Sequence, residues 1–322
     1  MNILITGGAG FIGSHLSEYY VSKGYNVLVI DNLSTGSIKN IRKLKESKNF
    51  RLLVEDIRES RVLYELIDEA DIIFHLAAAV GVKLIVESPV NTIENNVHST
   101  EIILSIASKK KKKVIFASTS EVYGCLDKVP YEEDDFLLIG NPQKGRWSYA
   151  CSKLLDEFLV LSYYKERKLP AVIVRLFNTV GPRQTGRYGM VLPTFVKQAL
   201  SNSDITVFGD GTQTRTFTHV KDVIKALGKI ADSDRCIGEI INIGGVEEIS
   251  IYDLAKRVKK ITGSKSKIVF IPYDKAYEKG FEDMYRRVPS IKKAERLIQY
   301  SPENSLEDII RDVMNYIKKE GD

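Results

Sequence analysis

Tyr149 and Lys153, four positions apart, are the residues of this sequence with the clearest capacity for chemistry. Residues at i and i+4 lie on one face of a helix, so this spacing would bring the two side chains together. A lysine ammonium favours the phenolate form of a nearby tyrosine, which lets a group that normally titrates near ~10 act as a base at neutral pH. The same short spacing also occurs in ordinary surface pairs, so its meaning depends on the rest of the chain.

A hydroxyl-rich segment, Ser118–Ser120, follows an apolar stretch that we predict to be the fifth strand. Ligands collect at the carboxyl ends of strands in a doubly wound parallel sheet. Thr119 could therefore hydrogen-bond a substrate oxygen while a tyrosinate removes its proton. Ser120 and Glu121 complete the catalytic candidates. The alternative is an ordinary Ser/Thr-rich turn, which the same residues also favour.

A glycine-rich turn over residues 7–13 predicts a dinucleotide site. It follows the short apolar segment Asn2–Thr6 and precedes a helical pattern, the context in which such glycines permit a tight turn and close approach of a pyrophosphate. The phosphates would then lie at a helix N-terminus. The cofactor contacts expected in this turn are Gly7, Gly10, Phe11, Ile12 and Gly13.

An acidic residue at the end of the second apolar segment indicates which dinucleotide binds. The carboxylate of Asp31 can accept hydrogen bonds from both ribose hydroxyls and would repel a 2′-phosphate, which favours NAD over NADP. Further cofactor contacts are expected at Asn32, Asp56, Ile57, Leu76, Ala77 and Ala78. Asp56 could equally cap its own loop, and we expect His75 to be a packed histidine and not a catalyst.

Short apolar segments alternate with helical patterns and would position these residues. The expected strands are Asn2–Thr6, Asn26–Asp31, Phe50–Glu55, Ile72–Leu76, Val114–Ser118, Ala171–Leu176 and Ile240–Ile243. The expected helices are Gly13–Lys23, Arg61–Glu69, Val97–Ser108 and a segment capped by Ser250 that runs to about Thr262. Strands rich in Val, Ile and Leu that alternate with helices predict an α/β fold, a Rossmann-type doubly wound parallel sheet covered on both faces.

The regular alternation loosens after residue 178, where glycine and proline punctuate the chain. We expect an NAD-binding domain over residues 1–177, to which about 215–262 returns. Residues 178–214 and 263–322 would form a smaller C-terminal α/β domain that binds the substrate.

The composition of the 322 residues, 43% hydrophobic and 28% charged, is typical of a globular protein. The three cysteines, Cys125, Cys151 and Cys236, have no metal-type spacing and make a poor disulfide framework, so we expect no metal and a reducing, cytoplasmic location. No apolar run reaches about 18 residues, so no membrane span is expected.

A run of five lysines, 109–113, could be read as a nucleic-acid or membrane patch. It could also be a helix end, where cations suit the C-terminal dipole. We favour the helix end because the run is short, no aromatic residues interleave with it, and the net charge of +5 is modest. We therefore expect neither nucleic acid nor membrane as a partner.

Taken together, these motifs resemble the extended short-chain dehydrogenase/reductase family of nucleotide-sugar epimerases, dehydratases and decarboxylases, nearly from end to end. The resemblance rests on GGAGFIG, the Asp31 segment, HLAAA, STSEVYG, YACSK, RLFNTVGPRQ and GDGTQTRTFTHVKDV. It implies a UDP-sugar substrate that is oxidised at C4 by tightly held NAD to a 4-keto intermediate. It also implies a homodimer built from helices of the Rossmann domain.

By this likeness, Tyr149 is the base, Lys153 lowers its pKa and binds the nicotinamide ribose, and Thr119 orients the 4-hydroxyl. Two further residues match positions that meet the nucleotide diphosphate, Asn178 and Arg215, and an arginine fork suits that task. Val191, in the segment 186–193, is expected to contact the substrate as well.

The fate of the ketosugar is less constrained. A 4-epimerase needs only rotation of the ketosugar and return of the hydride, whereas a 4,6-dehydratase needs a base at C5 and an acid for the 6-hydroxyl. The dehydratase motif carries Asp–Glu after the threonine, but here Ser120 stands in place of the Asp and is a poor proton donor. A decarboxylase needs cations to seat a hexuronate carboxylate and a donor that protonates the carbanion.

The segments 146–149 and 287–291 resemble two decarboxylating relatives, the UDP-glucuronate decarboxylase domain of the bacterial polymyxin-resistance enzyme and plant UDP-apiose/xylose synthase. In the first of these, the matching active-site positions are Thr119, Ser120, Glu121, Arg146, Tyr149, Lys153 and Arg287. The two arginines could instead bind phosphate or a domain surface. Against this likeness, segment 186–193 resembles epimerases.

The arginine that epimerases usually place near position 280 is replaced by Lys279–Asp283, whose acids could repel a phosphate or address a ribose. We favour hexuronate decarboxylation over 4-epimerisation, with 4,6-dehydration third. The alternative from another class is a non-catalytic NAD-binding scaffold, and the intact Thr–Tyr–Lys set counts against it.

Overall fold

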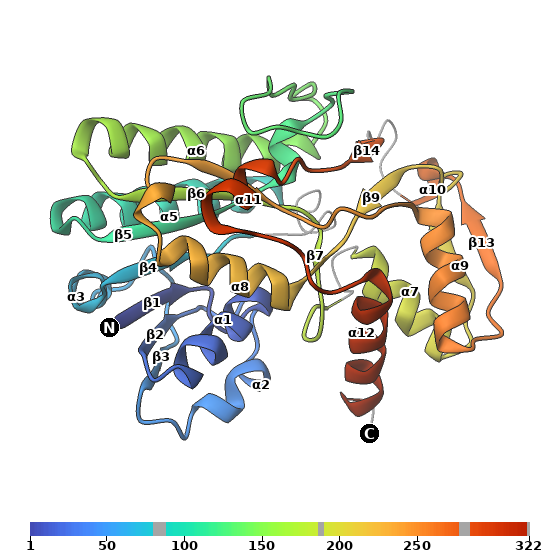
Figure 1. Ribbon diagram of the computed structural model, residues 1–322, viewed down its shortest axis with the longest axis horizontal. Coiled ribbons are helices and arrows are strands. Elements are labelled where there is room, and N and C mark those ends of the chain that lie inside the picture. The colour runs from blue at the N-terminus through green and yellow to red at the C-terminus, as the bar shows by residue number, and fades with distance from the viewer. Residues whose placement is uncertain (80–87, 186–189, 277–283, 321–322) are drawn as a thin grey trace.

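The computed structural model of the chain describes residues 1–79, 88–185, 190–276 and 284–320 (Figure 1). A central sheet with helices on both faces occupies one side of the molecule, and a smaller group of helices and short strands occupies the other (Figure 1). Among the described residues, no helix is both long and apolar enough to cross a membrane.

Seven parallel strands form the central sheet, in the order β11-β6-β5-β4-β1-β2-β3. Their bounds are β1 Asn2–Thr6, β2 Asn26–Ile30, β3 Phe50–Leu53, β4 Ile72–His75, β5 Lys113–Thr119, β6 Ala171–Leu176 and β11 Ile240–Ile243. The order reverses beside β1, and this is where a doubly wound sheet opens a crevice for ligands at the carboxyl ends of its strands. The predicted Rossmann-type fold is confirmed.

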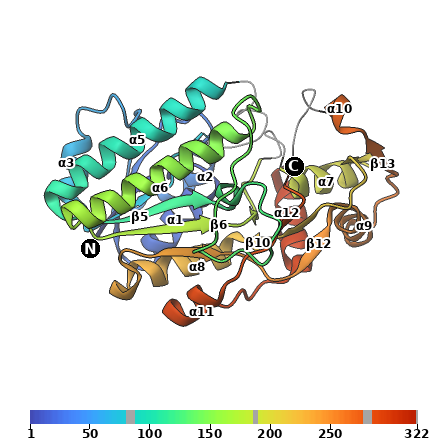
Figure 2. The ribbon, with the colours of Figure 1, turned by 90° about the horizontal axis from the view of Figure 1, so that it is seen from above.

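Two layers of helices cover this sheet, and Figure 2 shows one on each face. The first layer contains α3 Leu63–Glu69, α5 Pro89–Lys110 and α6 Trp147–Arg167. The second contains α1 Phe11–Ser22, α8 Val220–Ala231 and α11 Lys292–Ile298. Because both faces are covered, the strands carry almost continuous apolar residues, as parallel sheets require. The short helices α2 Ile38–Ile41 and η1 Arg42–Leu44 follow β2.

The smaller part surrounds a separate apolar core made by three helices and several short strands. The helices are α7 Val191–Leu200, α9 Ile251–Thr262 and α12 Leu306–Glu320. The strands pair as β8 Ile205–Phe208 with β13 Ile268–Ile271, β9 Thr214–Thr216 with β12 Glu248–Ser250 and β14 Arg286–Arg287, and β7 Thr179–Val180 with β10 Thr218–His219. The remaining short helices are η2 Ser120–Tyr123, η4 Asp234–Cys236 and α10 Tyr273–Ala276.

Most predicted elements have the bounds expected from the sequence to within two residues. Helix α9 begins after Ser250, whose side chain accepts a hydrogen bond from the backbone N–H of Asp253, as predicted. Helix α5 differs, because it begins at Pro89 and not near residue 97. Its first two turns are mainly polar, so they lack the apolar periodicity from which helices are predicted.

Two helices pack on the other side of the domain boundaries that the sequence suggests. Helix α9 buries Leu254 and Val258 against α7 and α12 in the smaller part, although we expected it to return to the NAD-binding domain. Helix α11 buries Ala294 and Ile298 in the core of the central sheet, although we expected it in the substrate domain. Apolar spacing shows which face of a helix is buried but not which sheet it covers.

The lysine run lies at the amino end of β5, where three neighbouring helices end. Lys111 donates to the carbonyl oxygen of Arg167 in α6, and Lys112 donates to that of Asp68 in α3 at 2.8 Å. Lys113 donates to the carbonyl oxygens of Ala231, the last residue of α8, at 2.8 Å and of Ser233 at 3.1 Å. Lys110 forms an ion pair with the Asp68 carboxylate at 2.8 Å. Cations at helix C-termini complement the helix dipole, so the helix-end interpretation is confirmed and extends to three further helices.

Strand β14 connects the two parts of the molecule. Arg286 and Arg287 pair with β9 of the smaller part. The next residues pair with the larger part, because Tyr131 donates its N–H to the carbonyl of Val288 and accepts from Ser290, each at 2.8 Å. Tyr131 is buried and stacks on Tyr123 of η2. The segment is thus held from both sides.

Candidate active site

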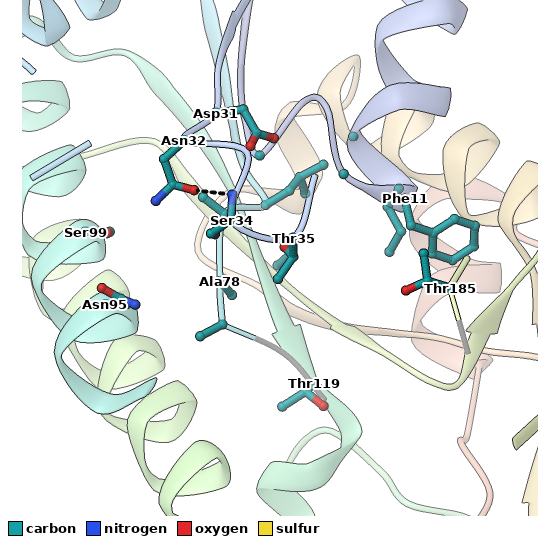
Figure 3. Close-up of a pocket in the computed structure, with 18 of the residues that line it drawn as sticks. Phe11, Asp31, Asn32, Ser34, Thr35, Ala78, Asn95, Ser99, Thr119 and Thr185 are labelled. Atoms are coloured by element: carbon teal, nitrogen blue, oxygen red, sulfur yellow. Dashed lines mark hydrogen bonds between the residues drawn. The ribbon is translucent and has the colours of Figure 1, made fainter. Parts of the chain in front are cut away.

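A cavity of about 730 Å³ opens at the carboxyl end of the central sheet. Figure 3 shows Asp31 and Asn32 at one end of it and Thr119 at the other, with Phe11 across from the α5 residues Asn95 and Ser99. The predicted residues that line it are Gly7, Gly10, Phe11, Ile12, Gly13, Asp31, Asn32, Asp56, Ile57, Leu76, Ala77, Ala78, Thr119, Ser120, Glu121, Tyr149, Asn178 and Arg287. One cavity therefore brings most of the predicted site residues together.

The glycine turn between β1 and α1 leaves no space for side chains. Gly7 has a φ of +71°, and a Cβ atom there would lie 2.9 Å from the backbone nitrogen of Ala77. A Cβ atom on Gly13 would lie 2.2 Å from the carbonyl oxygen of Gly7. No side chain caps the N-terminus of α1, so its first N–H groups are oriented for an anionic ligand at this turn.

Asp31 and Asp56 form the end of the cavity beside β2 and β3. Asp31 accepts hydrogen bonds from the backbone N–H groups of Ala9 at 2.9 Å and Leu33 at 2.8 Å. Burial raises the pKa of this carboxyl in spite of those bonds. Asp56 accepts from the N–H and the guanidinium of Arg58, each at 2.9 Å, and this hydrogen bonding lowers its pKa. Asp56 therefore caps its own loop and also lines the cavity.

Thr119 and Tyr149 meet at the carboxyl end of β5. The Thr119 hydroxyl caps η2 by accepting from the N–H of Glu121 at 3.2 Å, and it lies on the side of Tyr149 that faces the cavity. Burial raises the pKa of Tyr149, and the carboxylates of Glu121 and Asp156 act in the same direction, while the Thr119 hydroxyl and the charge of Arg287 oppose them. Formation of a tyrosinate at neutral pH therefore depends on positive charge close to this hydroxyl.

Lys153 lies one helical turn beyond Tyr149 on α6 but is not among the lining residues. Its side chain is 2% exposed, and the ammonium lies 3.8 Å from the centre of the Phe116 ring and 3.4 Å from an oxygen of Asp156. Burial lowers the pKa of Lys153. Its expected contacts with Tyr149 and a ribose remain predictions.

Two arginines hold the Glu121 carboxylate beside these groups. Arg146, at the start of α6, donates to it at 3.1 Å, and Arg287 of β14 lies 3.3 Å from its other oxygen. Arg287 also donates to the Asn178 side chain at 2.6 Å. The side chains of Arg146 and Arg287 are only 4% and 13% exposed. Three separate elements thus concentrate charge next to the Thr119–Tyr149 pair.

A protein-family model described as GDP-mannose 4,6 dehydratase matches residues 4–313. The chain belongs to this family.

Individual relatives agree with that assignment. The chain is 43% identical over 317 residues to a UDP-N-acetyl-α-D-glucosaminuronate decarboxylase of Bacillus cytotoxicus, covering 98% of this chain and 97% of the relative. It is 34% identical to UDP-glucuronic acid decarboxylase 1 of Xenopus tropicalis, covering 99% of this chain and 72% of the relative.

Among solved structures, UDP-glucuronic acid 4-epimerase of Bacillus cereus, in complex with UDP-glucuronic acid and NAD, is 33% identical. The two superpose with a TM-score of 0.89 over 99% of this chain and 100% of that one. The family prediction is therefore confirmed: this is an NAD-dependent enzyme that acts on nucleotide sugars through C4 chemistry.

NAD, the family's cofactor, fits the cavity as the structure describes it. The turn at Gly7 and Gly13 is too tight for side chains and lines the cavity together with the uncapped N-terminus of α1, where the pyrophosphate would be held. Asp31 lines the cavity just after β2 and would hold the adenosine ribose. When bound, NAD accepts a hydride and later returns it. Within the described parts of the chain, no cluster of His, Cys, Asp and Glu could hold a metal ion.

Several predicted family site residues do not line the cavity. Arg146 and Lys153 are buried and are not among the residues that line it. Arg215 donates to the carbonyls of Thr214 at 2.8 Å and Tyr285 at 3.3 Å. Val191 packs toward the core of the smaller part, whereas its neighbour Met190 lines the cavity. The segments 186–189 and 279–283 lie outside the described residues, so their expected effects remain predictions.

One wall of the cavity was not predicted from the sequence: a row of polar residues along α5 and at its N-cap. Its members are Ser88, Asn91, Thr92, Asn95 and Ser99. They recur at intervals of three and four residues, which is the same helical signal that apolar residues give. Counting polar residues at that spacing would have found both the row and the true start of the helix. Other unpredicted lining residues include Arg58, Arg183, Gln184, Thr185 and Tyr316.

Proposed function

We propose that this enzyme is a UDP-hexuronate decarboxylase, which oxidises C4 of the sugar, releases the C5 carboxyl group as carbon dioxide and then reduces the 4-ketone. The observation that carries the proposal is the Glu121 carboxylate held by Arg146 and Arg287 beside Thr119 and Tyr149. Arginine recognises carboxylates well, and Arg287, which lines the cavity, is the guanidinium that we propose for the hexuronate carboxylate.

The chemistry follows from the position of the ketone. In a 4-keto hexuronate, the C5 carboxyl is β to the carbonyl, so the electrons of the broken carbon–carbon bond pass to O4 as an enolate. Thr119 and Tyr149 are placed to hydrogen-bond O4. Tyr149 takes the O4 proton in the first step and returns it in the last, with Lys153 supplying positive charge. The proton added to C5 must come from the Glu121 cluster or from water bound to it.

The relatives support a hexuronate substrate from two sides. The Bacillus cytotoxicus relative acts on UDP-N-acetylglucosaminuronate, so the 2-acetamido hexuronate is the first substrate we propose, with UDP-glucuronate second. The Bacillus cereus epimerase, 33% identical, supports 4-epimerisation of a UDP-hexuronate as the second candidate function. Both functions need a site for the hexuronate carboxylate. In the first, carbon dioxide leaves, and in the second, the ketosugar rotates and the hydride returns to its other face.

The test is to incubate the purified protein and NAD with UDP-N-acetylglucosaminuronate, UDP-glucuronate and UDP-glucose in parallel and to read the products by mass spectrometry. Loss of carbon dioxide from either hexuronate supports the proposal. Unchanged mass with a new sugar configuration favours the epimerase, and loss of water from UDP-glucose favours the dehydratase. If no nucleotide sugar is converted, the proposal is wrong.

We also propose a homodimer in the cytoplasm. Helices α5 and α6 expose large apolar side chains on their outer faces, namely Val90 at 65%, Ile93 at 42%, Leu155 at 48% and Phe158 at 64%. Leu154 and Leu161 instead pack inward. All three cysteines are free thiols, which suits a reducing compartment. Light scattering tests the dimer, and Phe158→Glu should shift it toward monomer.

A further inference from the structure

A buried carboxylate accompanies the ammonium of Lys153. Asp156, on the same helix, is 0% exposed, and its Oδ2 lies 3.4 Å from the Lys153 nitrogen. Neither of its oxygens has a hydrogen-bond partner among the described residues. A fully buried helix position normally carries an apolar residue, and a buried carboxylate is costly unless a cation compensates it. The contact with Lys153 provides that compensation.

The charged neighbours of this pair are already paired elsewhere. Glu157 accepts two hydrogen bonds from Arg175 of β6, at 3.0 and 2.7 Å, and a further one from Ser118. From η2, the Glu121 carboxylate faces the two arginines of the cavity. Asp156 is therefore the carboxylate placed to balance Lys153.

Tyr149 of the same helix also faces the pair, and the Asp156 charge raises its pKa. A further titratable neighbour, His75 of β4, adds no charge. The Thr100 hydroxyl of α5 faces Asp156 but donates to the carbonyl of Asn96 at 2.9 Å. It therefore accepts from Nε2 of His75 at 3.2 Å, which leaves Nδ1 to accept from the Thr6 hydroxyl at 2.8 Å. Burial lowers the pKa of His75 to about 3, so this imidazole is neutral.

We propose that Asp156 is a positioning residue for the oxidation at C4: its carboxylate is the counter-ion that keeps Lys153 protonated and holds the ammonium next to Tyr149. The inference rests on the role proposed for Lys153. Burial lowers the pKa of Lys153 and the Asp156 charge opposes this shift. Burial raises the pKa of Asp156 to about 6, so its carboxylate is charged above that pH.

Asp156→Asn tests the proposal because it removes the charge and keeps the shape. Without the carboxylate, the pKa of Lys153 should fall further. A lower pKa of Lys153 reduces the fraction of the ammonium form at a fixed alkaline pH. We expect kcat at mildly alkaline pH to drop by about 10- to 100-fold, with a smaller loss at acidic pH. The alkaline decline of kcat in the pH profile should therefore begin at a lower pH.

Asp222→Asn is the matched control. Asp222 lies on α8, is 2% exposed and accepts hydrogen bonds from Asn304 at 2.8 and 3.1 Å. It does not line the cavity. This control should lower stability without moving the pH profile. An Asp156→Asn profile of unchanged shape, whether at full rate or reduced equally at every pH, would overturn the proposal.

A double-mutant cycle of thermal unfolding covers the case in which Asp156→Asn folds poorly. The variants are Asp156→Asn, Lys153→Met and the two combined. A counter-ion pair predicts that the combined variant melts at a higher temperature than Asp156→Asn alone, because no buried cation is left uncompensated. Additive effects would contradict the pairing. This cycle needs no substrate, so it separates failure of the inference from failure of the proposed decarboxylation.

Discussion

The two ends of strand β5 carry charged side chains in opposite circumstances. At the amino end, the lysines of residues 110–113 are bonded to carbonyl groups or to a carboxylate at the ends of neighbouring helices. At the carboxyl end, Lys153 and Asp156 are buried, and the Asp156 carboxylate lies 3.4 Å from the Lys153 ammonium without a hydrogen-bond partner in the described part of the chain. The lysines at the amino end complement the C-termini of helices, whereas we expect the charged groups at the carboxyl end to act in catalysis.

This contrast shows how one strand can contribute both to stability and to function. Partners at the amino end are backbone carbonyls that are present in every folded molecule, so the lysines add stability. The carboxyl end borders the cavity for a substrate and NAD, so substitutions there are expected to change catalysis. Predicted effects of substitution therefore differ in kind between the two ends, and they can be ranked.

The largest effect is expected for Tyr149→Phe. The ring and its packing remain, but the group that exchanges a proton with O4 is lost, and general acid–base catalysis typically contributes about 10²- to 10⁴-fold in rate. We expect kcat to fall by that factor while the melting temperature and NAD binding stay near wild type. Steady-state kinetics with a UDP-hexuronate and thermal unfolding with and without NAD measure both. A large loss of stability would show that Tyr149 acts structurally.

Arg287→Met should rank second. It removes a guanidinium that contacts both Glu121 and Asn178, and truncating one partner of a buried, hydrogen-bonded charge pair typically costs about 2–5 kcal/mol. We expect kcat/KM for a UDP-hexuronate to fall at least about 30-fold, because each ~1.4 kcal/mol is a factor of ten.

Its neighbour provides the control. The Arg286 side chain is 45% exposed and pairs with Glu248 in the smaller part. Arg286→Met should leave kcat/KM within about twofold, since exposed ion pairs contribute little. If the two variants behave alike, Arg287 does not bind the carboxylate of the hexuronate.

Lys113→Met belongs to the other end of the strand and should alter stability alone. The Lys113 side chain is 12% exposed and donates to two carbonyls after α8. Hydrogen bonds that involve a charged group contribute about 1.5–3 kcal/mol, so urea unfolding should show a loss near the lower end of that range. The rate per folded molecule should not change. A changed kcat would mean that the two ends of β5 are coupled.

The smallest effect is expected for Lys110→Ala. Lys110 forms its ion pair with Asp68 at the surface, where solvent and salt screen the interaction. The unfolding midpoint should lie close to that of wild type at low salt and coincide with it at high salt. A clear shift that persists at high salt would show that Lys110, and not only Lys113, stabilises the helix ends.

The sequence predicted the central sheet and its ligand edge well, because the signals are local. Runs of Val, Ile and Leu mark the strands, and the glycine turn, Asp31 and the Thr119 segment each follow a strand directly. The domain assignment of α9 and α11 was not predictable in this way, because it depends on contacts between distant segments. The pairing of Lys153 with Asp156 is also absent from any short motif, although both lie on one helix.

Strand β14 has a mechanical consequence for how the enzyme could open. Arg287 pairs with β9 of the smaller part, yet the very next residues are fastened to Tyr131 of the larger part. A rotation of α7, α9 and α12 away from the sheet would therefore strain the chain between Arg287 and Val288. Because the Arg287 side chain also contacts Glu121 of the larger part, separating the two parts would break either this ion pair or the pairing with β9.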